Sequence, residues 1–238
     1  MEPLEAQLLR QTSAVRPTFW HRLRSELVTT LLPGEPHELV DVGAGAGLLG
    51  DHLAAARPDV GYRFVEAIPS LERELEGRFG GAANAGARST YSGARVVTLL
   101  DVLEHQGDDR AFLADLARKM DRGTALVLTV PALRSLWSGW DVALGHHRRY
   151  DWRSLLRVLR AAPFALREVS YLFPELVPAG FLRVLSRPAV ATALTDDAAF
   201  PRLPGVLDAA LYAAGSLSVR LRGWWPVGTS LLAVAERR

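Results

Sequence analysis

The stretch Leu39-Val40-Asp41-Val42-Gly43-Ala44-Gly45-Ala46-Gly47-Leu48-Leu49-Gly50 decides the fold of this 238-residue chain. An apolar run ends there in closely spaced glycines, and a helix-compatible segment, residues 48–56, follows at once. Glycine lacks a Cβ, so the backbone can turn tightly after a buried strand and a ligand can approach N–H groups at the next helix N-terminus. Residues 63–66 then predict a second strand ending in Glu66, where such folds place a carboxylate to accept ribose hydroxyls. The sequence therefore predicts a nucleotide-binding α/β domain.

The glycine spacing alone leaves two ligands open. Gly43-x-Gly45-x-Gly47 is the spacing usual for S-adenosylmethionine, whereas Gly45-x-Gly47-x-x-Gly50 satisfies the dinucleotide fingerprint. With Asp41 just inside the strand end, the run resembles the first motif of the class I S-adenosylmethionine-dependent methyltransferases. A glycine-rich turn without a ligand is the simplest alternative, but a strand, a glycine turn, a helix and a spaced acid coincide here.

A second motif supports this resemblance. Residues 95–100 form a leucine and β-branched run typical of a buried central strand. The run delivers Asp101-Val102-Leu103-Glu104-His105 at its carboxyl end, where open α/β sheets bind ligands. This pentapeptide resembles one common in methyltransferases related to the ubiquinone-biosynthesis type. An ordinary helix start at Glu104 and His105 is the alternative.

The resemblance implies an α/β fold with a Rossmann-like, seven-stranded, mostly parallel sheet whose last strand is antiparallel. We expect one domain. Its parts are N-terminal helices in residues 1–36, a cofactor-binding core in 38–171, a helical cap insertion in 172–226 and the last strand in 227–238. N-terminal helices usually lie over the nucleotide site in such enzymes, but the sequence favours a core position for Trp20 and a surface position for His21.

The third strand of such a sheet must be short here, around residues 88–91. Relatives often place an acidic contact to the adenine amine nearby, yet no Asp or Glu lies between Glu76 and Asp101. Backbone groups or Asn84 would replace it. Helical spacing predicts helices at 70–79, with Ser70 as N-cap, and, further along, at 108–120 and 206–222.

The loop from residue 131 to 150 is the most distinctive part of the chain. Its Trp137-Ser138 and Gly145-His146-His147-Arg148-Arg149-Tyr150 segments resemble a Trp-Ser and Gly-His-x-Arg-Arg-Tyr signature of one bacterial methyltransferase branch. Two histidines, two arginines and a tyrosine can supply a base and a clamp for an anion or carbonyl. Alternatively, Arg148 and Arg149 pair with Asp141 and Asp151 and hold the loop shut.

These motifs yield a set of candidate site residues for in-line methyl transfer to oxygen or nitrogen. No metal is expected, because the histidines lack convincing ligand spacing. An oxygen nucleophile needs a base to remove its proton. The candidates are Asp41, Gly43, Gly45, Gly47, Glu66, Asp101 and Val102 for the cofactor, His105, His146 and Tyr150 for the base, and Trp137, His147, Arg148 and Arg149 for the substrate.

The composition limits the partners and the catalytic chemistry that can be expected of this protein. The formal net charge of +2 is too small to indicate nucleic acid, and the absence of cysteine excludes disulfides and thiolate catalysis. The N-terminus lacks the features of a signal peptide, so we expect a cytoplasmic protein. Residues 172–190 are strongly apolar, but prolines and charges interrupt them, which favours an inserted cap over a membrane span. The aromatic and apolar character of the whole cap, residues 172–226, suggests a small hydrophobic acceptor. Trp224-Trp225 would seal a core edge or a homodimer contact, or else meet a membrane surface.

Two further functional classes stay open at this point. A nicotinamide dehydrogenase could use the dinucleotide fingerprint, although a Tyr-x-x-x-Lys catalytic set is missing. A binding or scaffold protein could retain the fold without turnover. Methyltransferase folds can also catalyse other rearrangements, in which the product gains no mass.

Overall fold

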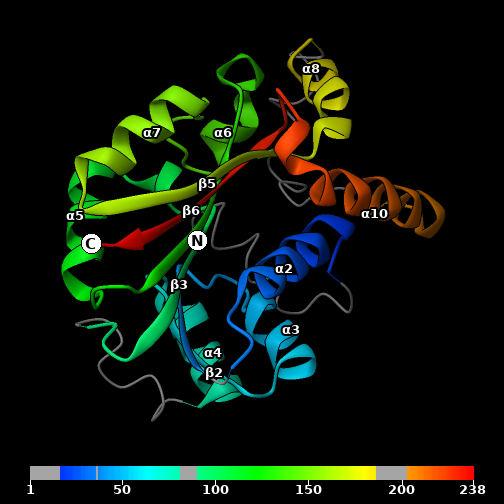
Figure 1. Ribbon diagram of the computed structural model, residues 1–238. Helices are drawn as coiled ribbons and strands as arrows, with labels where there is room; N and C mark the ends of the chain where they lie inside the picture. Colours follow the sequence, from blue (N-terminus) through cyan, green and yellow to red (C-terminus); the bar gives the residue numbers. More distant parts are fainter. Residues whose placement is uncertain (1–16, 36, 81–89, 186–202) are drawn as a thin grey trace.

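A six-stranded sheet with helices on both faces organises the chain (Figure 1). The computed structural model describes residues 17–35, 37–80, 90–185 and 203–238. The strands are β1 (His37–Val42), β2 (Val60–Val65), β3 (Ala94–Leu100), β4 (Ala125–Pro131), β5 (Phe164–Leu172) and β6 (Ser230–Arg237). The α-helices are α2 (Phe19–Leu31), α3 (Leu48–Ala56), α4 (Pro69–Phe79), α5 (Asp109–Lys119), α6 (Gly139–Ala143), α7 (Trp152–Ala161), α8 (Val177–Leu185) and α10 (Gly205–Arg220). Short 3-10 turns are η2 (Leu103–His105), η3 (Arg134–Leu136), η4 (Pro174–Leu176) and η5 (Arg222–Trp224).

The strand order β2-β1-β3-β4-β6-β5 places β1 and β3 side by side. Strands β1 to β4 are parallel, and β6 runs antiparallel between β4 and β5. The predicted antiparallel last strand is therefore confirmed. Because the crossovers return each parallel strand to the same direction, the carboxyl ends of β1 to β4 meet at one edge of the sheet.

The prediction of seven strands is wrong for the described part of the chain, which contains six. The extra strand was expected around residues 88–91. Thr90 and Tyr91 are not in a strand, and the Tyr91 N–H donates to the Lys119 carbonyl at the end of α5. The start of that stretch, together with Asn84, lies outside the described residues.

Local signals explain where several helices begin. The Asp108 carboxylate accepts hydrogen bonds from the Arg110 and Ala111 N–H groups and so caps α5. Helix α4 starts at Pro69 with Ile68 in the capping position, so the prediction of Ser70 as N-cap is wrong. Proline suits this first position, because its missing N–H would be unsatisfied there and its φ is already helical.

Two hydrophobic layers sandwich the sheet. Helices α2, α3 and α10 cover one face, with α2 packed against both α3 and α10 (Figure 1). Helices α5 and α7 cover the other face. Neighbouring strand residues such as Leu39 and Val40 point to opposite layers and are fully buried, as the two-residue period of a strand requires.

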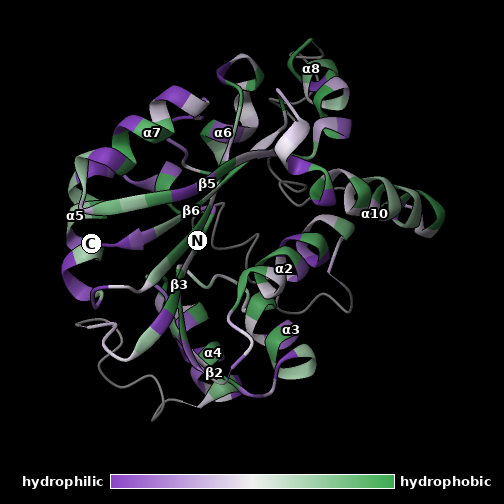
Figure 2. Ribbon diagram, viewed as in Figure 1, coloured by the Kyte–Doolittle hydropathy of each residue, from purple (hydrophilic) through white to green (hydrophobic). Residues whose placement is uncertain are grey.

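The expected cap region is helical where it is described. It comprises η4, α8, α10 and η5, and Figure 2 shows hydrophobic residues along much of α8 and α10. Several of these side chains are exposed, among them Leu185, Val206 and Trp224. None of the helices in the described ranges combines the length and the hydrophobicity that a membrane span requires.

Candidate functional site

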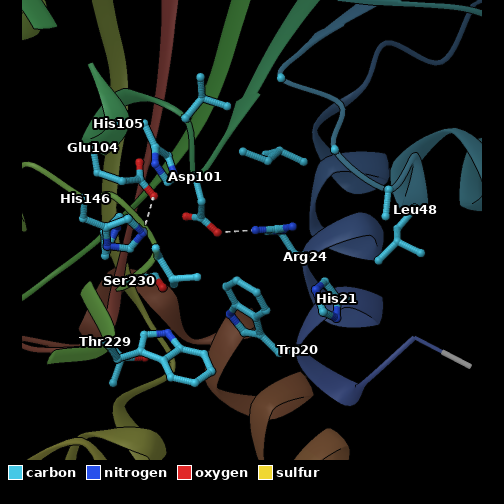
Figure 3. A pocket seen from close by; sticks show the side chains of 18 of the residues that line it. Trp20, His21, Arg24, Leu48, Asp101, Glu104, His105, His146, Thr229 and Ser230 are labelled. Atoms are coloured by element: carbon cyan, nitrogen blue, oxygen red, sulfur yellow. Dashed lines mark hydrogen bonds and ion pairs between the residues drawn. The ribbon is translucent and has the colours of Figure 1, made fainter. Parts of the chain in front are cut away.

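One cavity of about 450 Å³ opens where β1, β2 and β3 end (Figure 3). The glycine loop after β1 and the turn after β2 form one wall. Residues 101, 102 and 104–106, after β3, form the floor between this wall and the loop that follows β4. Helix α2 and the turn η4 with α8 close the remaining sides. Segments that are far apart in sequence thus share a single space.

The glycine loop can adopt its path only without side chains. Gly43 has φ +76°, and a Cβ there would lie 2.5 Å from Val102 Cγ2. Gly47 has φ +72°, and a Cβ there would lie 2.5 Å from Leu75 Cδ2. A left-handed backbone and missing space therefore both require glycine. Gly43 and Gly45 line the cavity, whereas Gly47 shapes the loop from behind.

Glu66 braces this loop from the end of β2. Its side chain is buried, and Oε2 accepts a hydrogen bond of 2.7 Å from the Gly45 N–H. Oε1 accepts from the N–H groups of Ala67 and Ile68 at 2.8 and 2.9 Å. The carboxylate also lines the cavity. Its contact with a ribose stays a prediction, since its described partners are backbone N–H groups.

Asp41 lies at the base of the cavity, buried at 2% exposure. Its carboxylate accepts from Thr98 Oγ1 at 2.7 Å and from the Tyr62 hydroxyl at 3.0 Å. Burial raises the pKa of Asp41, while these two hydrogen bonds oppose the shift. The residue therefore joins β1, β2 and β3 beneath the loop.

Asp101 connects the sheet to the N-terminal helix. Its backbone has φ +58°, which is strained for a residue with a side chain. The carboxylate forms an ion pair with Arg24 of α2 and accepts from Thr129 Oγ1 (Figure 3). The Arg24 guanidinium lies 4.4 Å from the centre of the Trp20 ring. These contacts bring α2 over the mouth of the site.

On the opposite side, Asp141 holds His146 and Arg149. Its side chain is fully buried, and Oδ1 lies 3.0 Å from His146 Nδ1 and 2.7 Å from Arg149 Nε. Oδ2 accepts from the Ser138 N–H at 2.9 Å, which also caps α6. Burial acts to raise the pKa of Asp141, but the bonds from His146 and Arg149 keep it below its ordinary value.

Glu104 and His105 face His146 across the cavity floor (Figure 3). The His105 and His146 rings are in edge contact, with centroids 4.8 Å apart, and Glu104 Oε1 lies 4.0 Å from His146 Nε2. Burial, and secondarily the charge of His146, lowers the pKa of His105 to about 4. Burial and the nearby Asp101 charge raise the pKa of Glu104 well above its ordinary value.

The structure does not bring all predicted residues to this cavity. Tyr150 is 1% exposed in the core, and its hydroxyl donates to Asp109 Oδ2 at 2.9 Å. Burial and this hydrogen bond raise the pKa of Tyr150, and its hydroxyl points to Asp109, so this position does not favour the predicted role of Tyr150 as a base. Trp137 and Arg148 line a separate surface hollow, and His147 is exposed.

Sequence reasoning missed several residues that line the cavity. Trp20 and His21 both reach it, so the expected surface position of His21 is wrong. Arg24, Trp140 and Arg183 were not predicted either. Their positions follow from how α2, α6 and α8 pack, and no local motif marks them.

The loop after β4 has features of both roles considered for it, a contribution to the site and a purely structural role. Arg149 pairs with Asp141, as the scaffold alternative expected, and it also lines the cavity. Arg148 pairs instead with Asp109 at 2.7 Å, and Asp151 pairs with Arg134. The expected pairing partner of Arg148 was therefore wrong, because the helix start at Asp109 lies closer in the fold.

Residues 14–169 match the family described as a methyltransferase domain. The chain belongs to this methyltransferase family. The match confirms the resemblance to class I S-adenosylmethionine-dependent methyltransferases and the expected cofactor, and it overturns the dehydrogenase alternative. Gly50 completes the dinucleotide fingerprint, but close packing explains why this position is a glycine. A Cβ there would lie 2.6 Å from the Tyr62 ring.

Solved structures share the fold at low sequence identity. The [4+2]-cyclase SpnF superposes with a TM-score of 0.61 at 17% identity, covering 99% of this chain and 93% of that one. A methyltransferase from Archaeoglobus fulgidus superposes with a TM-score of 0.53 at 13% sequence identity, covering 91% of this chain and 94% of that one. Phosphoethanolamine N-methyltransferase 2 from Haemonchus contortus, solved with S-adenosylhomocysteine, superposes with a TM-score of 0.55 at 11% sequence identity. The superposition covers 92% of this chain and 52% of that one. Curated protein sequences gave no match.

Proposed function

We propose that this methyltransferase acts on an oxygen or nitrogen atom of a small, largely hydrophobic acceptor. The observation that carries the proposal is one continuous cavity from the glycine loop to His146. A cofactor at the loop and an acceptor beside the histidines would occupy neighbouring parts of this space. Methyl transfer needs such neighbours, because nucleophile, methyl carbon and sulfur must lie in line at contact distance.

The walls of the acceptor side support the hydrophobic character of the substrate. Leu136, Trp140, Leu144 and Leu176 line it with apolar surface. Arg183 adds a guanidinium that lies 4.8 Å from the centre of the Trp140 ring. An acceptor with an apolar body and one polar or anionic group would match this lining.

In this proposal the His105 and His146 pair acts on the acceptor proton. His146 suits the task because Asp141 engages Nδ1, which leaves Nε2 on the cavity side near Glu104. A carboxylate that orients an imidazole and stabilises its charged form is the arrangement found in acid–base catalysis. Glu66, Asp41 and Asp101 hold the cofactor side in the same scheme.

The test begins with calorimetric titration by S-adenosylmethionine, S-adenosylhomocysteine and NAD in parallel. We expect micromolar binding of both adenosyl ligands and none of NAD. The protein is then incubated with S-adenosylmethionine and a panel of phenols, carboxylic acids and amines, and products are analysed for a methyl mass gain. Binding without any turnover would favour the scaffold alternative, and a product of unchanged mass would indicate a rearrangement.

A matched pair of variants tests the histidine role. His146→Gln should lower turnover by roughly 10²- to 10⁴-fold while the Kd for S-adenosylmethionine stays nearly constant. His52→Gln, on α3 and outside the cavity, is the control and should keep full turnover. Full turnover in His146→Gln would reassign the proton-accepting group.

A further inference from the structure

Glu104, His105 and His146 form a cluster of metal-ligating side chains. One donor atom from each lies within 4.8 Å of the other two. The prediction of no metal rested on spacing along the chain, where His105 and His146 are far apart. Folding brings them into edge contact, because the His147 N–H donates to the Glu104 carbonyl at 2.8 Å and fastens the loop to η2.

The Glu104 carboxyl is the least explained group in the cavity. Its side chain is completely buried, and within the described residues neither oxygen has a hydrogen-bond partner. Buried polar atoms almost always have a partner, and leaving one unsatisfied is costly. Both oxygens belong to a residue that lines the cavity beside the two histidines. A cation placed there would supply the missing interaction.

The surroundings of the two imidazoles fit metal ligation. Asp141 Oδ1 engages His146 Nδ1 at 3.0 Å, which leaves Nε2 directed towards Glu104. The backbone of Gly145 lies near the His105 imidazole. A carboxylate or carbonyl on the far nitrogen is the usual outer support of a metal-bound histidine. His146 has that support from Asp141.

We infer that Glu104, His105 and His146 bind a divalent transition-metal cation of the Zn²⁺ type at the acceptor end of the cavity. Two imidazoles and one carboxylate are a common set for such ions and leave a coordination position open. Ligand bonds of about 2.0 to 2.2 Å would separate the donor atoms by roughly 3.4 Å, so the three side chains would move together by about an ångström on binding.

The inference rests on the proposed function and deepens it by naming the acceptor's reactive group as an oxygen. An acceptor hydroxyl at the open position would lose its proton to water, because a bound cation lowers its pKa. The oxygen would then form a bond to the methyl carbon, while the carbon–sulfur pair returns to sulfur and yields S-adenosylhomocysteine. In this case the two histidines would hold the cation and would not accept the proton themselves, which replaces their direct role as a base in the proposed function.

The test measures metal binding by the full chain after chelator treatment. Samples are dialysed separately against Zn²⁺, Co²⁺ or Mg²⁺, and the metal content is determined by mass spectrometry. We expect one Zn²⁺ per chain, Mg²⁺ binding at least about tenfold weaker, and a visible Co²⁺ spectrum with nitrogen ligation. Glu104→Gln and His105→Gln should each lower the Zn²⁺ affinity at least tenfold, while His52→Gln should not.

Two further measurements keep the inference falsifiable. Circular dichroism checks folding, and if Glu104→Gln fails to fold, His105→Gln and His146→Gln carry the comparison. Wild-type protein without stoichiometric Zn²⁺, or folded variants with unchanged affinity, would overturn the metal site. S-adenosylmethionine titration in the presence of EDTA separates the two proposals, because the cofactor should still bind there.

Discussion

The two sides of the cavity, which we propose bind the cofactor and the acceptor, are held together by different means. On the cofactor side, backbone N–H groups of residues 45, 67 and 68 converge on one carboxylate, Glu66. On the acceptor side, charged side chains converge on Asp141, which contacts His146 and Arg149. A backbone cradle depends on a few glycines close together in sequence, whereas a charge network depends on residues that folding brings together.

This difference implies that the two sides of the cavity respond differently to substitution. The cradle tolerates little change, since Gly43 and Gly47 have positive φ and no room for a Cβ. The charge network consists of side chains, so a substitution there should leave the path of the glycine loop unchanged. If the distinction is correct, substitutions on the two sides should affect different measured quantities.

The largest effect is expected from Asp141→Ala. Removing this fully buried carboxylate leaves the Arg149 charge, with a side chain only 12% exposed, without its partner. The free energy of unfolding, measured by urea titration, should fall by about 3 to 5 kcal/mol. Asp151→Ala, which removes the partly exposed cap of α7, should cost only about 1 kcal/mol. A folded Asp141→Ala protein with tenfold weaker cofactor binding would contradict the independence of the two sides.

Glu66→Ala tests the cofactor side directly. Three backbone N–H groups lose a charged acceptor, and the glycine loop loses its brace. Charge-assisted hydrogen bonds contribute about 1.5 to 3 kcal/mol each, so the Kd for S-adenosylmethionine should rise roughly a hundredfold. The exposed Glu76→Ala substitution on α4 is the control. A nearly unchanged Kd in Glu66→Ala would remove this residue from the site.

His21, which lines the cavity, should make the free energy of unfolding depend on pH. Burial, and secondarily the charge of Arg24, lowers its pKa from 6.5 to about 3 in the folded state. Because the unfolded chain takes up the proton first, stability is full above about pH 6.5 and falls as the pH drops towards the folded value. Between pH 7 and 5 the wild type should lose about 2 kcal/mol more than His21→Asn in parallel urea titrations. Equal losses would show that His21 is protonated in the folded protein.

The smallest expected effect is that of Tyr62→Phe. The hydroxyl donates to Asp41 at 3.0 Å, while the ring packs against Phe79 and would be retained. The free energy of unfolding should decrease by about 1.5 kcal/mol. Tyr91→Phe should be nearly neutral, since its ring contact with Lys119 is kept. A hundredfold loss of cofactor affinity in Tyr62→Phe would mean that Asp41 itself binds the ligand and is not only a support.

Much of the cofactor side could be predicted from sequence because its signals are local. The helix expected at residues 48–56 is α3, and Asp101 lies directly after β3, as the patterns indicated. Glu66 lies one residue beyond β2, which was expected to include it. Tyr150 shows the limit of such reasoning. Its position in a histidine and arginine motif suggested chemistry, yet its ring is buried in the core and its hydroxyl bonds to Asp109.

The sequence by itself predicted the mostly parallel α/β fold and the glycine cradle, because strand periodicity and glycine spacing act over a few residues. The cofactor followed from the resemblance of two motifs to those of methyltransferases. Only the tertiary structure decided that Arg24 pairs with Asp101, that Asp141 holds His146, and that the Glu104 carboxyl has no hydrogen-bond partner in the described part of the chain. These relations join residues from separate elements. Their distances depend on how helices pack on the sheet, which the spacing of residues along the chain does not encode.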